Sequence, residues 1–207
     1  MKSRVEDLFP VRVYNFMFDN YKELNEELTK EVYNIKDKEN NVEKSNKGGF
    51  HSSIDLDLRS TDCFNELKNR ILDIMNQIII KNDFPHIKER HKELDQLHAM
   101  WFIINNKEDF NSKHIHPGSW FSGAYYVKVP DNEAKFLIFE DPIDIRTFEQ
   151  DSPPSYIKEV SEGMLVIFPG WFTHSVPPGD TDEDRIVISF NIPKPSLLFS
   201  RKELLNQ

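Results

Sequence analysis

The spacing of apolar residues divides the chain into a helical first part and a strand-rich second part. Between Tyr21 and Ile35 the apolar residues recur every three or four positions among Glu and Lys, which predicts an amphipathic helix. A second helix is predicted over residues 63–80, because Ser60, Thr61 and Asp62 are good N-cap residues and the apolar positions after them share one face. Residues 8–18, which begin with alternation, predict a first strand.

From Met100 the pattern changes to short apolar runs that are rich in β-branched and aromatic residues. Pro, Gly, Asn or Asp residues bound each run, and the predicted strands cover residues 100–105, 120–129, 134–139, 164–168 and 185–192. Strands that follow two helices predict an α+β fold that is mainly β, a sandwich or jelly roll with N-terminal helices packed on it. We expect one domain over residues 1–207, with the N-terminal strand and helices at about 8–82 and the β core at about 97–193. Between the helices, residues 37–47 predict a solvated loop and Gly48-Gly49 a turn.

Composition narrows the classes of function. The formal net charge of −9 argues against a sequence-independent nucleic-acid binder, which needs a basic face. We expect no signal peptide, because no long apolar run follows Met1, and no membrane span, because the apolar stretches fall far short of about 20 residues. The single cysteine, Cys63, excludes an internal disulfide and favours a cytoplasmic location.

Three histidines stand where strands are predicted to end. His114 and His116 are two apart, so on a strand both imidazoles would face one point, and Pro117-Gly118 turns the chain directly after them. His174 follows the run 164–168 in the same way, after its own Pro-Gly pair. Three neutral imidazoles suit Zn, Fe, Cu or Ni, and we predict a metal site. The other four histidines are weaker candidates: His51, His86, His91 and His98.

An arginine opens the last predicted strand. Residues 185–192 alternate between two faces, so four apolar residues share one face and Arg185, Val187, Ser189 and Asn191 share the other. There the guanidinium could bind a carboxylate bidentately, with the Ser189 hydroxyl adding a hydrogen bond. The alternative is an arginine at the strand edge, paired with one of the acidic residues Asp182, Glu183 or Asp184.

Taken together, these motifs resemble those of the iron(II)- and 2-oxoglutarate-dependent oxygenases, in particular a bacterial and phage branch with an HxHPG motif. The resemblance rests on residues 48–52, 114–119, 122–127, 139–142, 168–174 and 185–192. It implies a double-stranded β-helix, the jelly roll also called the cupin fold. It also implies an enzyme that uses O2 in a hydroxylase-type oxidation of an unknown substrate, with 2-oxoglutarate decarboxylated to succinate.

The resemblance assigns roles to five residues. It implies that His114 and His174 hold Fe(II), and that Arg185 holds the far carboxylate of 2-oxoglutarate. Tyr126 and Ser189 match residues that help to bind the same carboxylate.

The sequence departs from the family at one position. His116 stands where the usual facial triad has a carboxylate, so the site lacks one negative charge and the reaction type is open. We keep His116 as the third ligand; Glu140 or Asp141 is the alternative. Two other functions also stay open: a 2-oxoglutarate-independent cupin-type metal dioxygenase, and a non-catalytic jelly-roll binding module.

Overall fold

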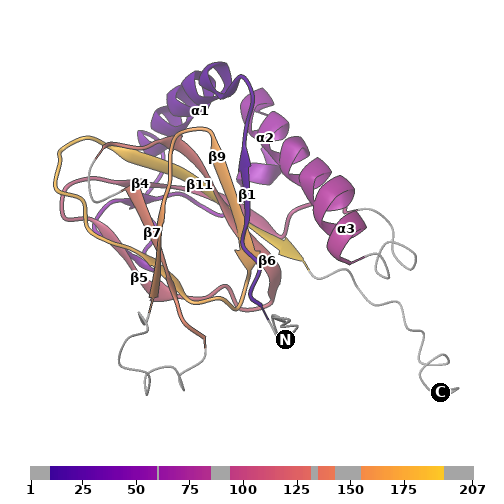
Figure 1. Cartoon of the computed structure of the whole chain (residues 1–207). Coiled ribbons are helices and arrows are strands. Elements are labelled where there is room, and N and C mark those ends of the chain that lie inside the picture. Colours follow the sequence, from indigo (N-terminus) through magenta and orange to yellow (C-terminus); the bar gives the residue numbers. More distant parts are fainter. Residues whose placement is uncertain (1–9, 60, 85–93, 132–134, 143–154, 194–207) are drawn as a thin grey trace, which may run out of the picture.

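The computed structural model describes residues 10–59, 61–84, 94–131, 135–142 and 155–193, and in these residues two antiparallel sheets pack face to face (Figure 1). The larger sheet has the order β1-β9-β6-β11-β4-β3 and the smaller one the order β2-β5-β10-β7-β8. The strands of the larger sheet are β1 (Tyr14–Met17), β3 (Phe50–His51), β4 (Ala99–Asn105), β6 (Ser119–Lys128), β9 (Met164–Pro169) and β11 (Arg185–Pro193). Those of the smaller sheet are β2 (Asn46–Lys47), β5 (Phe110–His114), β7 (Phe136–Glu140), β8 (Ser155–Glu159) and β10 (His174–Val176).

The chain crosses repeatedly from one sheet to the other. From β4 onward, successive strands lie in alternate sheets, except for the paired strands β7 and β8 in the smaller sheet. This winding is that of a double-stranded β-helix, so the predicted fold, mainly β with N-terminal helices, is confirmed.

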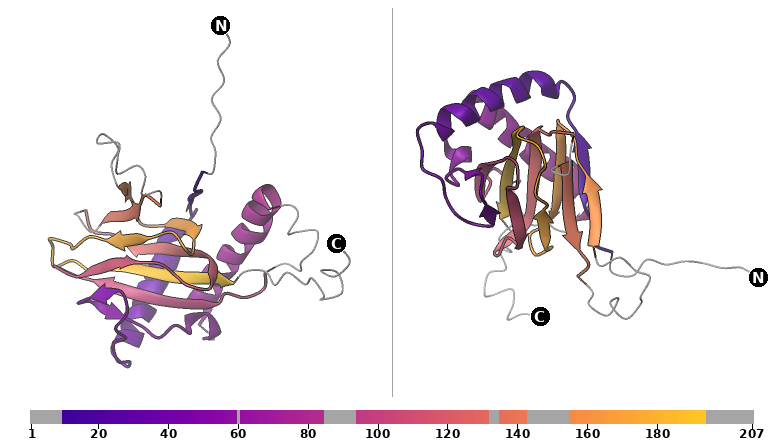
Figure 2. Two further views of the ribbon diagram at one scale, coloured as in Figure 1. Left: turned by 90° about the horizontal axis from the view of Figure 1, so that it is seen from below. Right: turned by 90° about the vertical axis from the view of Figure 1, so that its left-hand side faces the viewer.

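The helices cover the outer face of the larger sheet (Figures 1 and 2). They are α1 (Tyr21–Lys36), α2 (Asp62–Asp73), the π-helical turn η2 (Ile74–Ile80) and α3 (Lys81–Asp83), and a short 3-10 turn η1 spans Leu56–Leu58. Leu28 of α1 and Phe64 of α2 are fully buried in one core with Ile188 and Phe190 of β11. Both predicted helices are confirmed, and the second extends three residues further, to Asp83. No helix among the described residues has the length and apolar character needed to cross a membrane.

The segment predicted as a loop and turn connects the two sheets. β2, at the end of that loop, pairs with β5, whereas β3 pairs with β4 in the other sheet. Gly48 and Gly49 between them have φ of +69° and +64°, a conformation that favours glycine. A Cβ at Gly49 would lie 2.5 Å from the carbonyl oxygen of Ile104. The turn therefore closes one side of the space between the sheets.

Four strands were not predicted from the sequence, β2, β3, β8 and β10, and a fifth, β5, was expected only around His114 and His116. They are two to five residues long, too short for a clear period, and depend on pairing with distant segments. The first predicted strand is shorter, at 14–17, and the one at 134–139 is shifted to 136–140. His86, His91 and the residues after Pro195 lie outside the described part of the chain.

Candidate active site

A pocket of about 460 Å³ lies between the two sheets. Its walls include Arg185, Val187, Ser189 and Asn191 of β11, while the alternate residues of this strand pack into the core beneath the helices. The predicted alternation of β11 is therefore confirmed, and its polar face lines the pocket.

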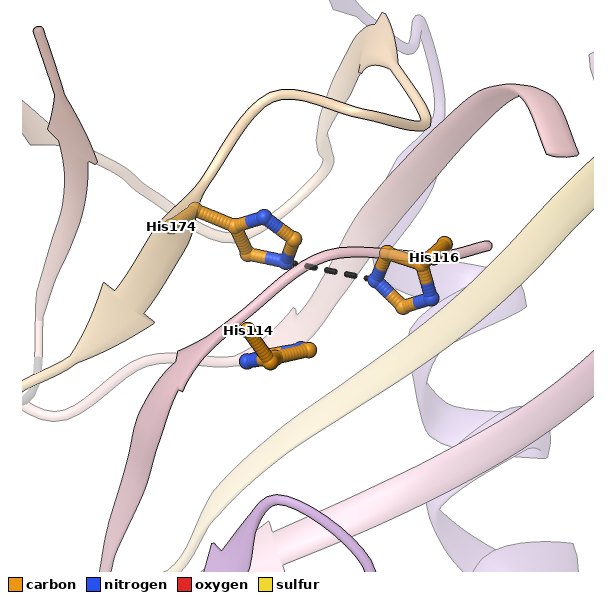
Figure 3. Close-up of side chains that lie close together, drawn as sticks. All are labelled: His114, His116 and His174. Atoms are coloured by element: carbon orange, nitrogen blue, oxygen red, sulfur yellow. Dashed lines mark hydrogen bonds between the residues drawn. The ribbon is translucent and has the colours of Figure 1, made fainter. Parts of the chain in front are cut away.

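The three predicted metal ligands come together at one wall of this pocket (Figure 3). His114 is the last residue of β5 and lies directly opposite His174, the first residue of β10, in the antiparallel pairing of these strands. The predicted same-face pair required His116 to continue the strand, and in the structure it does not. It lies two residues beyond β5, where its backbone N–H donates to the carbonyl of Gly170 at 2.7 Å. The Pro-Gly turns that follow β5 and β9 thus hold the third imidazole beside the other two.

Backbone carbonyls orient two of these imidazoles. The Nδ1 of His114 lies 2.7 Å from the Ser112 carbonyl oxygen, and the Nδ1 of His174 lies 2.9 Å from that of Phe172. Donation from Nδ1 leaves Nε2 with a free lone pair, which is the arrangement of metal-ligating histidines. The ligand atoms of the three residues all lie within 4.8 Å of one another.

Two of the ligand nitrogens already have the spacing that a shared ion requires. The Nε2 atoms of His116 and His174 are 3.3 Å apart, and two cis ligands at about 2.1 Å from one ion would be about 3.0 Å apart. Lone pairs at this distance need a proton or a cation between them. The site is therefore suited to a metal ion held on one face.

Burial keeps these imidazoles neutral. Desolvation lowers the pKa of His116 to about 4 and that of His174 to about 3, and it also lowers the pKa of His114. All three are neutral near pH 7, which is the protonation state that coordination requires.

The third ligand position has no carboxylate nearby. Glu140 forms an ion pair with Lys113 at 3.0 Å, and the group of described residues that could hold a metal consists of the three histidines alone. His116 instead contacts rings: its ring centre lies 5.1 Å from that of His174 and 5.6 Å from that of Trp101.

Arg185 is buried in the pocket wall without a counter-ion. Its side chain is 2% exposed, its Nε–H has no acceptor, and no carboxylate of a described residue lies within ion-pair distance. The guanidinium lies 5.3 Å from the ring centre of Tyr126, whose buried hydroxyl also has no hydrogen-bond partner. Burial raises the pKa of Tyr126 to about 12, so the phenol stays protonated and can donate. Together these groups are suited to bind an anion.

The alternative assignment of Arg185, as an arginine at the strand edge paired with one of the acidic residues at positions 182–184, is wrong. The carboxylate of Asp184 instead accepts hydrogen bonds from the Tyr33 hydroxyl at 2.6 Å and from the Asn106 side chain at 2.9 Å.

Ser189 lines the same pocket further along. In the sheet it lies opposite Trp101 and Ala124, whereas Arg185 lies opposite Asn105. Ser189 lies four residues after Arg185 on the strand, so their Cα atoms are roughly 13 Å apart. Ser189 is therefore level with Trp101 rather than with the guanidinium.

Three further polar groups of the pocket were not singled out from the sequence. Ser45 places its Oγ 3.5 Å from the Nε2 of His114, the indole of Trp101 stacks on His51 at 5.8 Å, and Asn111 is buried with an unpartnered Nδ2. The aromatic and polar character of these segments did not indicate where their side chains would lie relative to the pocket. Only the pairing of β2 with β5 and of β3 with β4 brings them to the pocket.

Several solved structures are similar to this fold. A prolyl-4-hydroxylase from Pseudomonas putida matches with a TM-score of 0.64 at 14% identity, over 89% of this chain and 94% of that chain. HygX from Streptomyces hygroscopicus with iron bound matches with a TM-score of 0.59 at 10% identity, over 89% and 83%. The viral collagen prolyl hydroxylase from Paramecium Bursaria Chlorella virus-1, in complex with 2OG, matches with a TM-score of 0.56 at 10% identity, over 86% and 94%.

The family match lies on the strands that carry the site. Residues 99–191 match a family model described as "Putative 2OG-Fe(II) oxygenase", and this range includes the three histidines and Arg185. None of the curated proteins matches the sequence. The part of the chain from β4 to β11 is therefore similar to the 2-oxoglutarate- and iron(II)-dependent oxygenases, a family of oxidoreductases.

Proposed function

We propose that this protein is a non-haem oxygenase in which His114, His116 and His174 hold Fe(II). Arg185 and Tyr126 bind the far carboxylate of 2-oxoglutarate in this proposal. The proposed reaction is hydroxylation of a substrate that this proposal leaves open.

The unpaired guanidinium of Arg185 carries this proposal. A charge buried without a counter-ion is strongly unfavourable, so a fold that keeps one has a ligand to supply the opposite charge. The far carboxylate of 2-oxoglutarate can accept two parallel hydrogen bonds from the guanidinium and one from the Tyr126 hydroxyl. The same pocket contains the three imidazole nitrogens, so one five-carbon diacid could contact both the metal and Arg185.

Iron and 2-oxoglutarate would supply the oxidising chemistry when they are bound: one oxygen atom of O2 would enter succinate as 2-oxoglutarate loses carbon dioxide, and the other would enter the substrate. The protein's own part is to bind and orient. Ser112 and Phe172 fix two ligand rings through their carbonyls, and Arg185 sets the direction of the keto acid. The neutral histidines do not have to lose protons at pH 7 to bind the metal.

Ser189 has a different place in this proposal from the one that the resemblance implied. Because it is level with Trp101, its hydroxyl is suited to the substrate or to the metal-facing end of 2-oxoglutarate rather than to the carboxylate at Arg185. A Ser189→Ala variant should thus lose at most about tenfold in affinity for 2-oxoglutarate, since a single hydrogen bond contributes about 0.5–1.5 kcal/mol.

The test is an anaerobic titration of the purified protein with Fe(II) and then 2-oxoglutarate, followed in the visible region. We expect a metal-to-ligand charge-transfer band that needs both additions and that is lost in His174→Ala. Admitting O2 should then yield succinate. A protein that binds Fe(II) but shows neither the band nor succinate would contradict the proposal.

A 2-oxoglutarate-independent dioxygenase is the second candidate. It is favoured by the three neutral imidazoles, a ligand set that suits direct binding of substrate to the metal. It leaves Arg185 without a partner, and we rank it second for that reason. Oxidation of a substrate without succinate formation would support it, whereas failure to retain any metal would favour a binding module.

The cellular setting is part of the proposal as well. We propose a cytoplasmic location, supported by the single free cysteine, Cys63, which is buried in the core below the helices. The acidic net charge supports a partner other than nucleic acid.

A further inference from the structure

The pocket is longer than a molecule of 2-oxoglutarate. Along β11 its wall runs from Arg185 to Asn191, roughly 20 Å of strand. The proposed 2-oxoglutarate site occupies the part between Arg185 and the histidines. The part beyond His116 is left for the substrate, and we name it the outer half. Its lining includes Ile54, His98, Ala99, Trp101, Ser189 and Asn191.

The described residues that line the pocket are less acidic than the chain as a whole. Asp and Glu make up 35 of 207 residues, yet none of the 24 described residues that line the pocket is acidic. A random sample of that size would contain about four. Lys44 and Arg185 contribute two positive charges. Lys44 makes no ion pair with a described residue.

The absence of a ligand carboxylate makes this imbalance larger. With three neutral imidazoles, a divalent ion keeps its full charge, and 2-oxoglutarate with two negative charges balances only that ion. The charges of Arg185, which is buried, and of Lys44, which is exposed at the edge of the pocket, then remain uncompensated, and solvent screens the buried charge less. The loaded pocket thus has an excess of positive charge.

Lys44 lies next to the outer half rather than at the Arg185 end. Ser45, the next residue, contacts the metal-facing nitrogen of His114. Burial lowers the pKa of His51, and the nearby charge of Lys44 lowers it further. His51 in turn stacks on Trp101, whose buried Nε1–H has no acceptor. A cation and an unpartnered donor therefore lie on the same side of the pocket.

We propose that the outer half binds a small organic acid as the substrate, with its carboxylate near Lys44 and the indole Nε1 of Trp101. The apolar lining, with Ile54, Ala99 and Ile115, suits an aliphatic body for this acid. A volume of about 460 Å³ for the whole pocket is in the range of small-molecule sites. This inference rests on the proposed function, because the charge count includes the metal and 2-oxoglutarate.

The test uses hexanoate and its neutral isostere hexanamide as probes. Protein is loaded with Co(II) and saturating 2-oxoglutarate without O2, and uptake of both is first verified by absorption. Paramagnetic relaxation of the probe protons, measured against a Zn(II)-loaded control, then reports binding near the metal. We expect hexanoate to bind at least about tenfold more tightly than hexanamide, and to bind more weakly at high salt.

Charge variants test the role of Lys44. Lys44→Glu should weaken hexanoate binding by about tenfold or more, and Lys44→Met by about threefold. Lys47→Glu is the matched control, because Lys47 is exposed on the same segment, does not line the pocket and changes the net charge equally. Its hexanoate affinity should stay within about twofold of the parent.

Several results would overturn the inference. Equal binding of hexanoate and hexanamide would indicate an uncharged substrate, and an equal effect of the two glutamate variants would indicate general electrostatics. Loss of hexanoate binding on addition of 2-oxoglutarate would place the probe at Arg185. Each of these outcomes leaves the proposed function intact. A protein that takes up neither Co(II) nor 2-oxoglutarate would refute both.

Discussion

Replacing Arg185 by methionine should weaken 2-oxoglutarate binding and stabilise the ligand-free protein at the same time. Methionine retains much of the aliphatic volume but neither the charge nor the donors. In the ligand-free protein Arg185 is 2% exposed and has no counter-ion among the described residues, so removal of its charge relieves a desolvation cost. In the loaded protein the same change removes a charge-assisted pair.

The two effects can be sized separately. Truncating one partner of a buried, hydrogen-bonded charge pair costs about 2–5 kcal/mol, which corresponds to a loss of affinity of about 30-fold to about 4,000-fold. Removing an uncompensated buried charge should raise the free energy of unfolding by about 1–3 kcal/mol, less than the full desolvation penalty because the pocket admits water. Metal affinity should not change, since the histidines contact neither Arg185 nor its replacement.

The measurements are urea unfolding of the metal-free protein and calorimetric titration of the Ni(II)-loaded protein with 2-oxoglutarate. Arg59→Met is the control, because Arg59 forms ion pairs with Glu39 at 2.7 Å and with Asp55 at 3.0 Å outside the pocket. It should lose about 1 kcal/mol of stability and keep its 2-oxoglutarate affinity. If Arg185→Met were destabilised and bound 2-oxoglutarate normally, the guanidinium would be a structural group and our reasoning would fail.

Three other predictions concern the metal ligands and the turn between the sheets. His116→Ala should lower Co(II) affinity by about 100-fold or more, whereas His116→Asp should restore it by supplying the usual carboxylate; titration followed by d–d absorption tests both. Below pH 6.5 the stability of the metal-free protein should fall toward pH 4, because unfolded imidazoles take up protons while folded His116 and His174, with pKa values of about 4 and about 3, stay neutral. Urea midpoints that do not change between pH 7 and 4.5 would contradict this. Gly49→Ala should cost about 2 kcal/mol in urea unfolding, because its Cβ would press on the Ile104 carbonyl at positive φ; an unchanged midpoint would show that the turn adapts.

The features that were predictable from the sequence are those with a local physical signature. The period of two in residues 185–192 correctly separated the pocket face of β11 from its core face, because one face meets the helices and the other a polar pocket. The Pro-Gly turns after His116 and before His174 indicated strand ends correctly. Both helices followed from their apolar spacing.

The features that sequence reasoning missed depend on pairing between distant segments. Trp101 reaches the pocket because β4 pairs with β11, and its stacking partner His51 arrives there because β3 pairs with β4 across some fifty residues of chain. The two-residue strands β2 and β3 carry no period and cannot be distinguished from a loop by composition. His116 illustrates a partial failure: the residue was identified correctly, but its position outside the strand follows from the hydrogen bond to Gly170.

The choice of histidine at position 116 has consequences for the whole pocket. With aspartate there, one negative charge would belong to the protein and would balance part of the metal's charge. With imidazole, each negative charge near the metal has to come from a ligand, because no described residue of the lining is acidic. The full charge of the metal would then strengthen the binding of both 2-oxoglutarate and an acidic substrate. His116→Asp should accordingly weaken hexanoate binding even where it preserves the metal, and that coupling would tie the third ligand to the choice of substrate.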